Sequence, residues 1–179
     1  MSKLIFVLGG ARSGKSKYAS EIAIKRGKKA VFIATAAALD DEMRKRIRLH
    51  RISRPKDWGL IEEPMNLKEA VLGLKSAYGT AIIDCLGLWV SNMLMAGMKD
   101  ALIEKRSKEL AAAMAKSKAG LIIVVSNEVG EGIVPGDALS RRFRDLLGLT
   151  NQVMASKADE VIMMHAGIPV KIKYGKADV

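Results

Sequence analysis

Residues 9–16 read GGARSGKS, directly after the apolar run LIFVL at residues 4–8. This stretch matches the phosphate-loop pattern G-x-x-x-x-G-K-S, whose backbone N–H groups surround a chain of phosphates. The pattern needs a buried strand before it and a helix after it, and residues 17–26 favour a helix whose positive N-terminal end faces the anion. The stretch therefore predicts a binding site for a nucleoside triphosphate and places it within an α/β fold.

The residue types within the loop indicate separate roles. Glycines at positions 9 and 14 allow backbone conformations that a side chain would forbid. The amine of Lys15 would reach the β- and γ-phosphates, and the hydroxyl of Ser16 would bind Mg²⁺. The expected nucleotide contacts of the loop are Gly9, Gly10, Ala11, Arg12, Ser13, Gly14, Lys15 and Ser16.

The length and composition predict one folded domain over residues 1–179, because 49% of the residues are hydrophobic and can form a core. No stretch approaches the ~18 consecutive apolar residues of a membrane span, so we expect none. The one cysteine, Cys85, permits no internal disulfide, which is typical of a reducing cytoplasm. Its apolar neighbours indicate a structural thiol rather than a reactive one.

The formal net charge of +11 is compatible with a nucleic-acid surface or with anionic small substrates. Aromatic residues make up only 4% of the chain, so platforms for stacking single-stranded bases are scarce. The basic residues are dispersed, with the densest groups at 25–29 and 44–51. We therefore expect small anionic substrates and no nucleic acid, while an ATPase stimulated by nucleic acid stays as an alternative.

Short apolar segments rich in Val and Ile recur along the chain with helical segments between them. Because they are apolar throughout rather than alternating, they indicate strands buried on both faces of a mainly parallel sheet. We expect such strands at Leu4–Leu8, Ala30–Ala34, Ala81–Cys85, Leu121–Ser126 and Glu160–His165, and an alternating edge strand at Val170–Tyr174. We expect helices at residues 17–26, 40–51, 66–78, 100–118 and 136–157, the third beginning with a capping box of Asn66 and Glu69. The pattern predicts a single α/β domain of the RecA-like P-loop NTPase class, with a mainly parallel central sheet flanked by helices.

Polar residues follow two of the expected strands. Asp84 ends a buried strand, where the acidic partner of a phosphate loop commonly binds Mg²⁺; the alternative role is to cap the next helix. Residues 127–135 follow another strand and predict a loop at the edge of the sheet where α/β proteins bind ligands. An ordinary connection is the alternative for this loop.

The chain has only two histidines, and we expect His165, at the end of a strand, to be structural. His50 continues the helical row of Met43 and Ile47, which suits a core residue. It also lies among Arg46, Arg48, Arg51 and Arg54, which suit phosphate. A neutral imidazole there could act as a nucleophile. The residues alone leave both roles open.

A series of motifs spans nearly the whole chain in a fixed order. They are GGARSGKS at 9–16, IAT at 33–35, DDEMRKRI at 40–47, HRISRPKDW at 50–58, Glu62, DCLGLWVSN at 84–92, SNEVGEGIVP at 126–135, RRFRDLLG at 141–148, NQ at 151–152, ADEV at 158–161 and AGIPVKIK at 166–173. Together they resemble the bifunctional adenosylcobinamide kinase / adenosylcobinamide-phosphate guanylyltransferase family of cobalamin biosynthesis. Leu49, Gly87 and Ala36 depart from residues that are frequent in that family, namely His, Thr and Ser.

The resemblance implies two reactions on one scaffold. ATP or GTP phosphorylates the aminopropanol hydroxyl of adenosylcobinamide, and GMP is then transferred from GTP to adenosylcobinamide phosphate through a guanylylated histidine, here His50. The resemblance implies a homotrimer, whereas the loop pattern and the strand end favour a catalytic Lys15 and Mg²⁺ held by Ser16 and Asp84. The further nucleotide contacts it implies are Ala34, Thr35, Ala36, Arg51, Ile52, Ser53, Arg54, Glu62 and Asp84. A plain phosphate-loop kinase with a structural His50 is the competing enzyme.

Overall fold

The computed structural model describes residues 2–36, 55 and 57–175. Its strands are β1 (Lys3–Gly9), β2 (Ala30–Ala34), β3 (Gly59–Glu62), β4 (Thr80–Asp84), β5 (Leu121–Val125), β6 (Glu160–His165) and β7 (Ile168–Lys173). Its helices are α1 (Lys15–Lys25), α3 (Leu67–Leu72), α4 (Leu86–Met95), α5 (Asp100–Ala115) and α6 (Ala138–Lys157).

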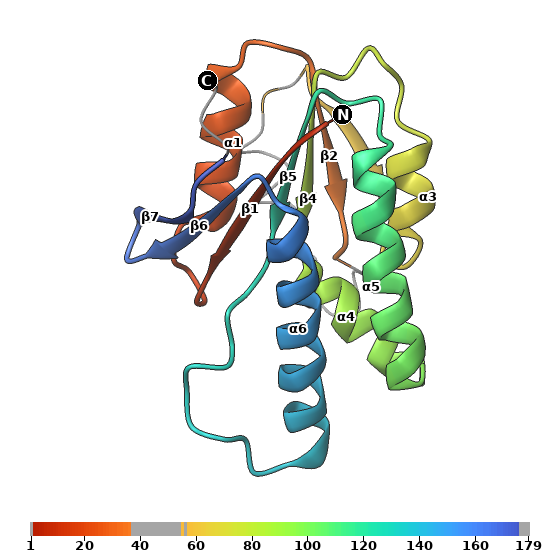
Figure 1. Cartoon of the computed structure of the whole chain (residues 1–179), viewed down its shortest axis with the longest axis vertical. Coiled ribbons are helices and arrows are strands. Elements are labelled where there is room, and N and C mark those ends of the chain that lie inside the picture. Colours follow the sequence, from red (N-terminus) through yellow and green to blue (C-terminus); the bar gives the residue numbers. More distant parts are fainter. Residues whose placement is uncertain (1, 37–54, 56, 176–179) are drawn as a thin grey trace.

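The strands form one seven-stranded sheet in the order β3-β2-β4-β5-β1-β6-β7 (Figure 1). Every neighbouring pair is parallel except β6 and β7, which form an antiparallel hairpin at one edge. The predicted mainly parallel sheet with β7 at the edge is confirmed. Strand β3 was not predicted, because it is short and its residues are alternately half-buried and exposed at the other edge of the sheet.

Helices cover both faces of the sheet. Alternate strand residues such as Ile5, Val7 and Phe32 pack with Ala19 and Ala23 of α1 on one face. The other set packs against α3, α4, α5 and α6, which lie together on the opposite face (Figure 1). The methionines Met93, Met114 and Met154 are fully buried in this second layer. The central strands are buried on both faces because each face has its own helical layer.

The predicted capping box at the start of α3 is wrong. The Asn66 side chain makes no capping hydrogen bond. Instead Glu63, which precedes the helix, accepts hydrogen bonds from the backbone N–H groups of Met65 (2.9 Å) and Asn66 (2.7 Å). The helix ends at Leu72, well before the predicted 78. Once Glu63 occupies these donors, the helix start needs no reciprocal bond from Glu69.

Other helix boundaries also differ from the prediction. Helix α5 ends at Ala115 rather than 118, and α6 begins at Ala138, where Asp137 caps it by accepting from Ser140 N at 2.8 Å. Helix α4 was not predicted, because it is hydrophobic on most of its surface and lacks a helical repeat of polar residues. The predicted helix at 40–51 lies outside the described residues.

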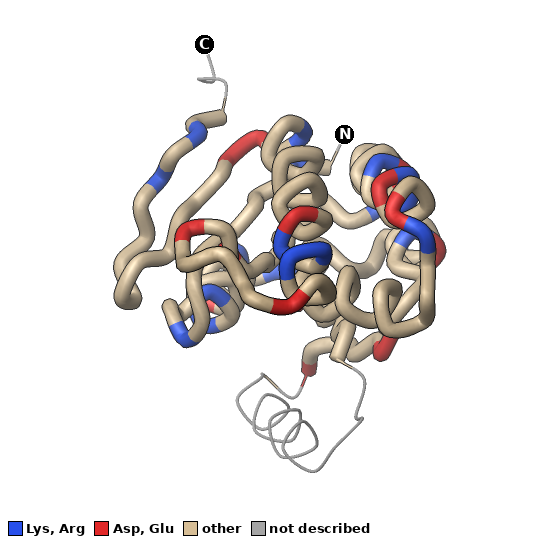
Figure 2. Tube along the Cα trace, turned by 90° about the horizontal axis from the view of Figure 1, so that it is seen from below, with Lys and Arg blue, Asp and Glu red and all other residues tan. Residues whose placement is uncertain are grey.

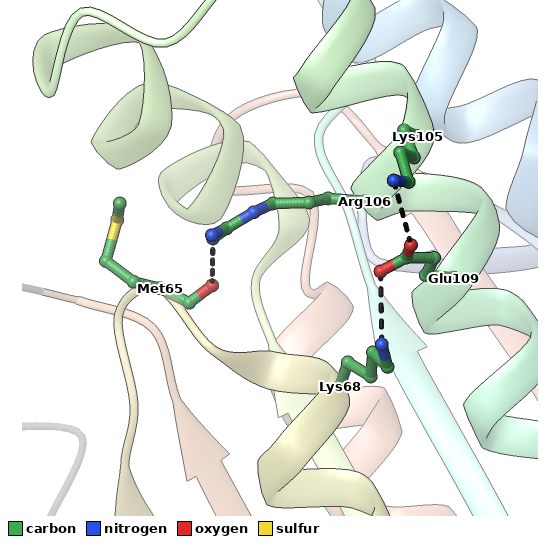
Figure 3. Close-up of polar contacts among 5 residues, drawn as sticks. All are labelled: Met65, Lys68, Lys105, Arg106 and Glu109. Atoms are coloured by element: carbon green, nitrogen blue, oxygen red, sulfur yellow. Dashed lines mark hydrogen bonds and ion pairs between the residues drawn. The ribbon is translucent and has the colours of Figure 1, made fainter.

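The basic and acidic residues of the described chain are interspersed along several helices (Figure 2). Ion pairs cross between helices, as between Arg142 of α6 and Asp100 of α5 at 2.6 Å. On the outside of α3 and α5, Glu109 binds both Lys68 and Lys105 (Figure 3). Among the described residues no helix is long and apolar enough to cross a bilayer.

Candidate nucleotide-binding site

The phosphate loop joins β1 to α1 as its sequence predicts. Gly14, with φ 93°, is the N-cap residue, and the helix begins at Lys15. The Lys15 side chain is buried, and its Nζ donates a hydrogen bond to the carbonyl of Gly10 at 2.6 Å. The lysine therefore folds back over its own loop, so its charge lies where the loop's backbone N–H groups gather.

Gly9 is required by the close approach of β6. A Cβ at this position would lie 2.4 Å from the carbonyl oxygen of Met164 and 2.7 Å from the hydroxyl of Ser13. Its φ of 150° is also one that side chains rarely adopt. Any side chain at this position would push the loop away from the sheet.

Two other segments support the loop. The N–H of Gly167, in the β6–β7 turn, donates to the carbonyl of Ser13 at 3.1 Å. The N–H of Glu128, just after β5, donates to the carbonyl of Gly9 at 3.0 Å. The loop predicted at residues 127–135 thus begins beside the phosphate loop. The β6–β7 turn was missed as part of the site, although the glycine at position 167 between two apolar runs favours a turn there.

The hydroxyl of Ser13 lies inside the loop without a hydrogen-bond partner among the described residues. The residue is only 8% exposed. A buried hydroxyl without a partner is costly in a closed protein and is satisfied when a ligand oxygen reaches it. This feature fits the phosphate that the loop sequence predicts.

Three of the predicted site residues lie side by side at the carboxyl edge of the sheet. The strand register pairs Ala34 of β2 with Glu62 of β3 on one side and with Asp84 of β4 on the other. Asp84 is half-buried and Glu62 is exposed. Because β4 is next to β5, and β5 next to β1, this row continues toward the phosphate loop.

Cys85 follows Asp84, through a peptide bond that is cis, and is buried. Burial raises the pKa of its thiol to about 11, and the charge of Asp84 adds to the effect, whereas the charge of Lys15 opposes it. The thiol therefore stays protonated near neutral pH, which supports the prediction of a structural cysteine.

Helix α6 holds the start of the loop after β5. Asn151 accepts a hydrogen bond from the Ser126 hydroxyl at 2.7 Å and donates to the carbonyl of Asn127 at 3.1 Å. The Asn127 side chain in turn lies against Gly87, where a Cβ would be 3.1 Å from its amide nitrogen. Asn151 belongs to the NQ motif at 151–152, for which no role was predicted. Its two hydrogen bonds show that it supports this loop.

The described residues contain no group of three or more His, Cys, Asp and Glu side chains that could hold a metal ion on their own. Mg²⁺ bound with a nucleotide takes one or two protein oxygens, and phosphates and waters complete the octahedron. The predicted pair has this chemistry: the Ser16 hydroxyl is in the first turn of α1 and the Asp84 carboxylate ends β4. The residues present therefore fit a nucleotide-bound Mg²⁺.

Of the remaining residues considered for the site, some lie at strand ends and others lie outside the described residues. Thr35 is buried and Ala36 half-buried just after β2, while His165 is exposed at the end of β6. The predicted nucleophile and the basic segment after it lie outside the described residues; they are His50, Arg51, Ile52, Ser53 and Arg54.

Comparison with known proteins adds three findings. Residues 5–172 match the family model "Cobinamide kinase / cobinamide phosphate guanyltransferase". The chain is 40% identical over 174 residues to the bifunctional adenosylcobalamin biosynthesis protein CobP of Pseudomonas aeruginosa, covering 93% of this chain and 95% of that protein. It is 38% identical over 182 residues to the bifunctional adenosylcobalamin biosynthesis protein CobU of Escherichia coli, covering 95% and 99%.

Among solved structures, the RadB recombinase aligns with a TM-score of 0.50 and 14% identity, over 90% of this chain and 73% of that one. At this identity the likeness concerns the fold alone. It confirms the predicted RecA-like phosphate-loop class.

Proposed function

The chain belongs to the cobinamide kinase / cobinamide phosphate guanyltransferase family, and from this premise we propose how its own residues perform the two reactions. The enzyme phosphorylates adenosylcobinamide and then joins GMP to the product, giving adenosylcobinamide-GDP. A single domain carries both steps. The observation that carries the proposal is the complete phosphate loop with the Lys15 amine folded over it.

In the kinase step the γ-phosphoryl group of ATP or GTP moves to the aminopropanol hydroxyl of adenosylcobinamide. The loop N–H groups at residues 9–16 and the Lys15 amine hold the β- and γ-phosphates and stabilise the charge that develops between them. Lys15 is already folded into the loop, so little of its freedom is lost on binding. This step depends on the positioning of the substrates and on the stabilisation of phosphate charge, and it needs no nucleophilic side chain of the protein.

In the guanylyl step a neutral nitrogen of His50 attacks the α-phosphorus of GTP. A P–N bond forms, the bond to the bridging oxygen breaks, and pyrophosphate leaves with the electron pair. A phosphate oxygen of adenosylcobinamide phosphate then attacks the same phosphorus and releases His50. Arg51 and Arg54 follow His50 closely in the sequence, and their positive charges would stabilise the negative charge of the leaving pyrophosphate.

The proposal includes Mg²⁺, which when bound neutralises the phosphate charge. Ser16 and Asp84 would hold it through their oxygens, which is supported by the position of Ser16 in the first turn of α1, directly after the phosphate loop, and of Asp84 at the end of β4. The other nucleotide contacts in the proposal are the phosphate-loop residues, Ala34, Ala36, Arg51, Ile52, Ser53, Arg54 and Glu62.

Covalent labelling tests the guanylyl step. With Mg²⁺ and GTP labelled at the α-phosphate, the wild-type protein should retain label after denaturation, whereas GTP labelled at the γ-phosphate should leave none. The bond should be lost in acid and kept in alkali, as expected of a phosphoramidate. A plain kinase would take no label from either nucleotide while still phosphorylating adenosylcobinamide.

We also propose that the protein is a cytoplasmic homotrimer. The absence of disulfide pairing at the single buried Cys85 supports the location. Exposed apolar side chains support self-association, among them Ile133 (98% exposed) and Val134 in the β5–α6 connection and Ile168 and Ile172 on β7. Light scattering at micromolar concentration should give three times the chain mass of 19.4 kDa. A single chain mass would remove the trimer and leave the enzymology in place.

A further inference from the structure

Two buried threonines on neighbouring strands differ in what their hydroxyls do. Thr35 directly follows β2 and Thr80 begins β4, and both are fully buried. The Thr80 hydroxyl has no hydrogen-bond partner among the described residues. The Thr35 hydroxyl has two partners on Cys85: it donates to the Cys85 carbonyl and accepts from the Cys85 N–H, each at 2.7 Å.

Thr35 holds both polar atoms of the peptide group that links Asp84 to Cys85. Its backbone N–H donates to the carbonyl of Asp84 at 3.2 Å, and its hydroxyl accepts from the N–H of Cys85. With the further bond to the Cys85 carbonyl, three hydrogen bonds tie one residue to the chain that carries the Asp84 carboxylate. The backbone of Asp84 therefore cannot rotate without breaking them.

Thr35 is itself held from helix α4. Asn92 donates from one amide nitrogen to the carbonyl of Thr35 at 2.9 Å and to the carbonyl of Pro64 at 3.1 Å. The next carbonyl, of Met65, accepts from the Trp89 indole at 2.9 Å. It also accepts from Arg106 at 3.4 Å (Figure 3). The segments that follow β2 and β3 are thus joined to one another and to the helices behind them.

These bonds leave Thr35 with no donor for a phosphate. Its backbone N–H and its hydroxyl proton are both used within the protein, and its side chain is buried. Phosphate oxygens only accept hydrogen bonds, so a direct contact would have to break one of them. The nucleotide contact that the sequence resemblance implied for Thr35 would therefore cost one of these bonds.

We propose that Thr35 is a positioning residue for Asp84: it fixes the peptide that follows this aspartate and thereby the aim of its carboxylate at the nucleotide-bound Mg²⁺. The inference rests on the proposed metal role of Asp84. Groups that orient a metal ligand typically contribute about 10- to 100-fold to metal affinity. Loss of the Thr35 hydroxyl should therefore weaken nucleotide binding only when Mg²⁺ is present.

The test measures the affinity for a fluorescent GTP analogue with Mg²⁺ and with EDTA, and takes the ratio as the Mg²⁺ enhancement. Thr35→Val keeps the shape but removes the hydroxyl, and should reduce the enhancement about 10- to 100-fold while leaving the affinity in EDTA close to wild type. Thr35→Ser keeps the hydroxyl and should restore the enhancement. The ratio is taken within one protein, so a general loss of stability does not mimic the result.

Thr80→Val is the matched control, because it removes an equally buried threonine hydroxyl from the adjacent strand. It should keep the wild-type enhancement, and its unfolding temperature should be equal or higher, since an unpaired hydroxyl is replaced by a methyl group. Thr35→Val should instead lower the unfolding temperature, because the N–H and carbonyl of Cys85 lose their partner.

A double-mutant cycle connects the effect to Asp84. In the Asp84→Asn background, adding Thr35→Val should change the Mg²⁺ enhancement no further. An equal weakening of binding by Thr35→Val in Mg²⁺ and in EDTA, or additivity with Asp84→Asn, would overturn the inference and indicate a direct nucleotide contact. A wild-type protein whose affinity does not respond to Mg²⁺ would instead overturn the metal role of Asp84 in the proposed function, and the inference with it.

Discussion

Replacing His50 by alanine is expected to abolish covalent labelling by α-labelled GTP and to reduce guanylyl transfer by more than about a thousandfold, as removal of a catalytic nucleophile does. Phosphorylation of adenosylcobinamide should continue near the wild-type rate, because that step depends on positioning and charge stabilisation. Product formation with each labelled nucleotide, measured separately for the two steps, checks both halves of the expectation.

The chain contains its own control for this experiment. His165 is the only other histidine and is exposed at the end of β6. His165→Ala should keep the acid-labile label, which excludes nonspecific guanylylation of imidazole. If the label persists in His50→Ala, the nucleophile lies elsewhere. If the wild type takes no label under conditions of turnover, the transfer is direct and His50 is structural.

Replacing Lys15 by alanine is expected to lower nucleotide-dependent phosphoryl transfer about a hundredfold, equivalent to about 3 kcal/mol of transition-state stabilisation. The reason is the loss of the Lys15 amine, which the structure places over the phosphate loop. The variant also loses the hydrogen bond to the Gly10 carbonyl, so thermal unfolding without nucleotide should be measured beside turnover. A loop that is merely loosened would show a large change in unfolding temperature and a small change in rate at saturating nucleotide.

Lys17→Ala is the matched control for Lys15→Ala. Lys17 is on the same helix, but its side chain is 84% exposed and its ion pair with Glu21 is long, at 3.9 Å. Its removal should leave phosphoryl transfer near wild type, because an exposed pair of this kind contributes little. Near wild-type turnover in Lys15→Ala itself would mean that the loop binds something other than the reacting nucleotide.

Local residue patterns were enough to predict the elements whose conformation depends on residues close together in the sequence. Five of the seven strands were expected from runs that are apolar throughout, since only burial on both faces accounts for such runs. The hairpin strand β7 was expected from its alternation. The phosphate loop was expected residue by residue, because its glycines and lysine are needed for backbone geometry and charge that no other residue types supply.

Patterns failed where a neighbour far away in the sequence decides the outcome. Strand β3 is short and half-exposed, and it becomes a strand because β2 offers it an unpaired edge. The capping of α3 was assigned to Asn66 and Glu69, but Glu63 takes the donors because β3 ends just before it. Neither the pairing of β3 with β2 nor the capping of α3 by Glu63 can be predicted from a short stretch of sequence alone.

By itself the sequence determined the family and predicted the site's chemistry from a phosphate loop, an acidic strand end and a histidine beside arginines. Only the tertiary structure decided how they are supported. It aligned Glu62, Ala34 and Asp84 in one row, placed the β6–β7 turn against the phosphate loop, and engaged every donor of Thr35. Residue types set which bonds a side chain can form, whereas strand order and register set which partner comes within hydrogen-bonding distance, and these depend on contacts between segments remote in the chain.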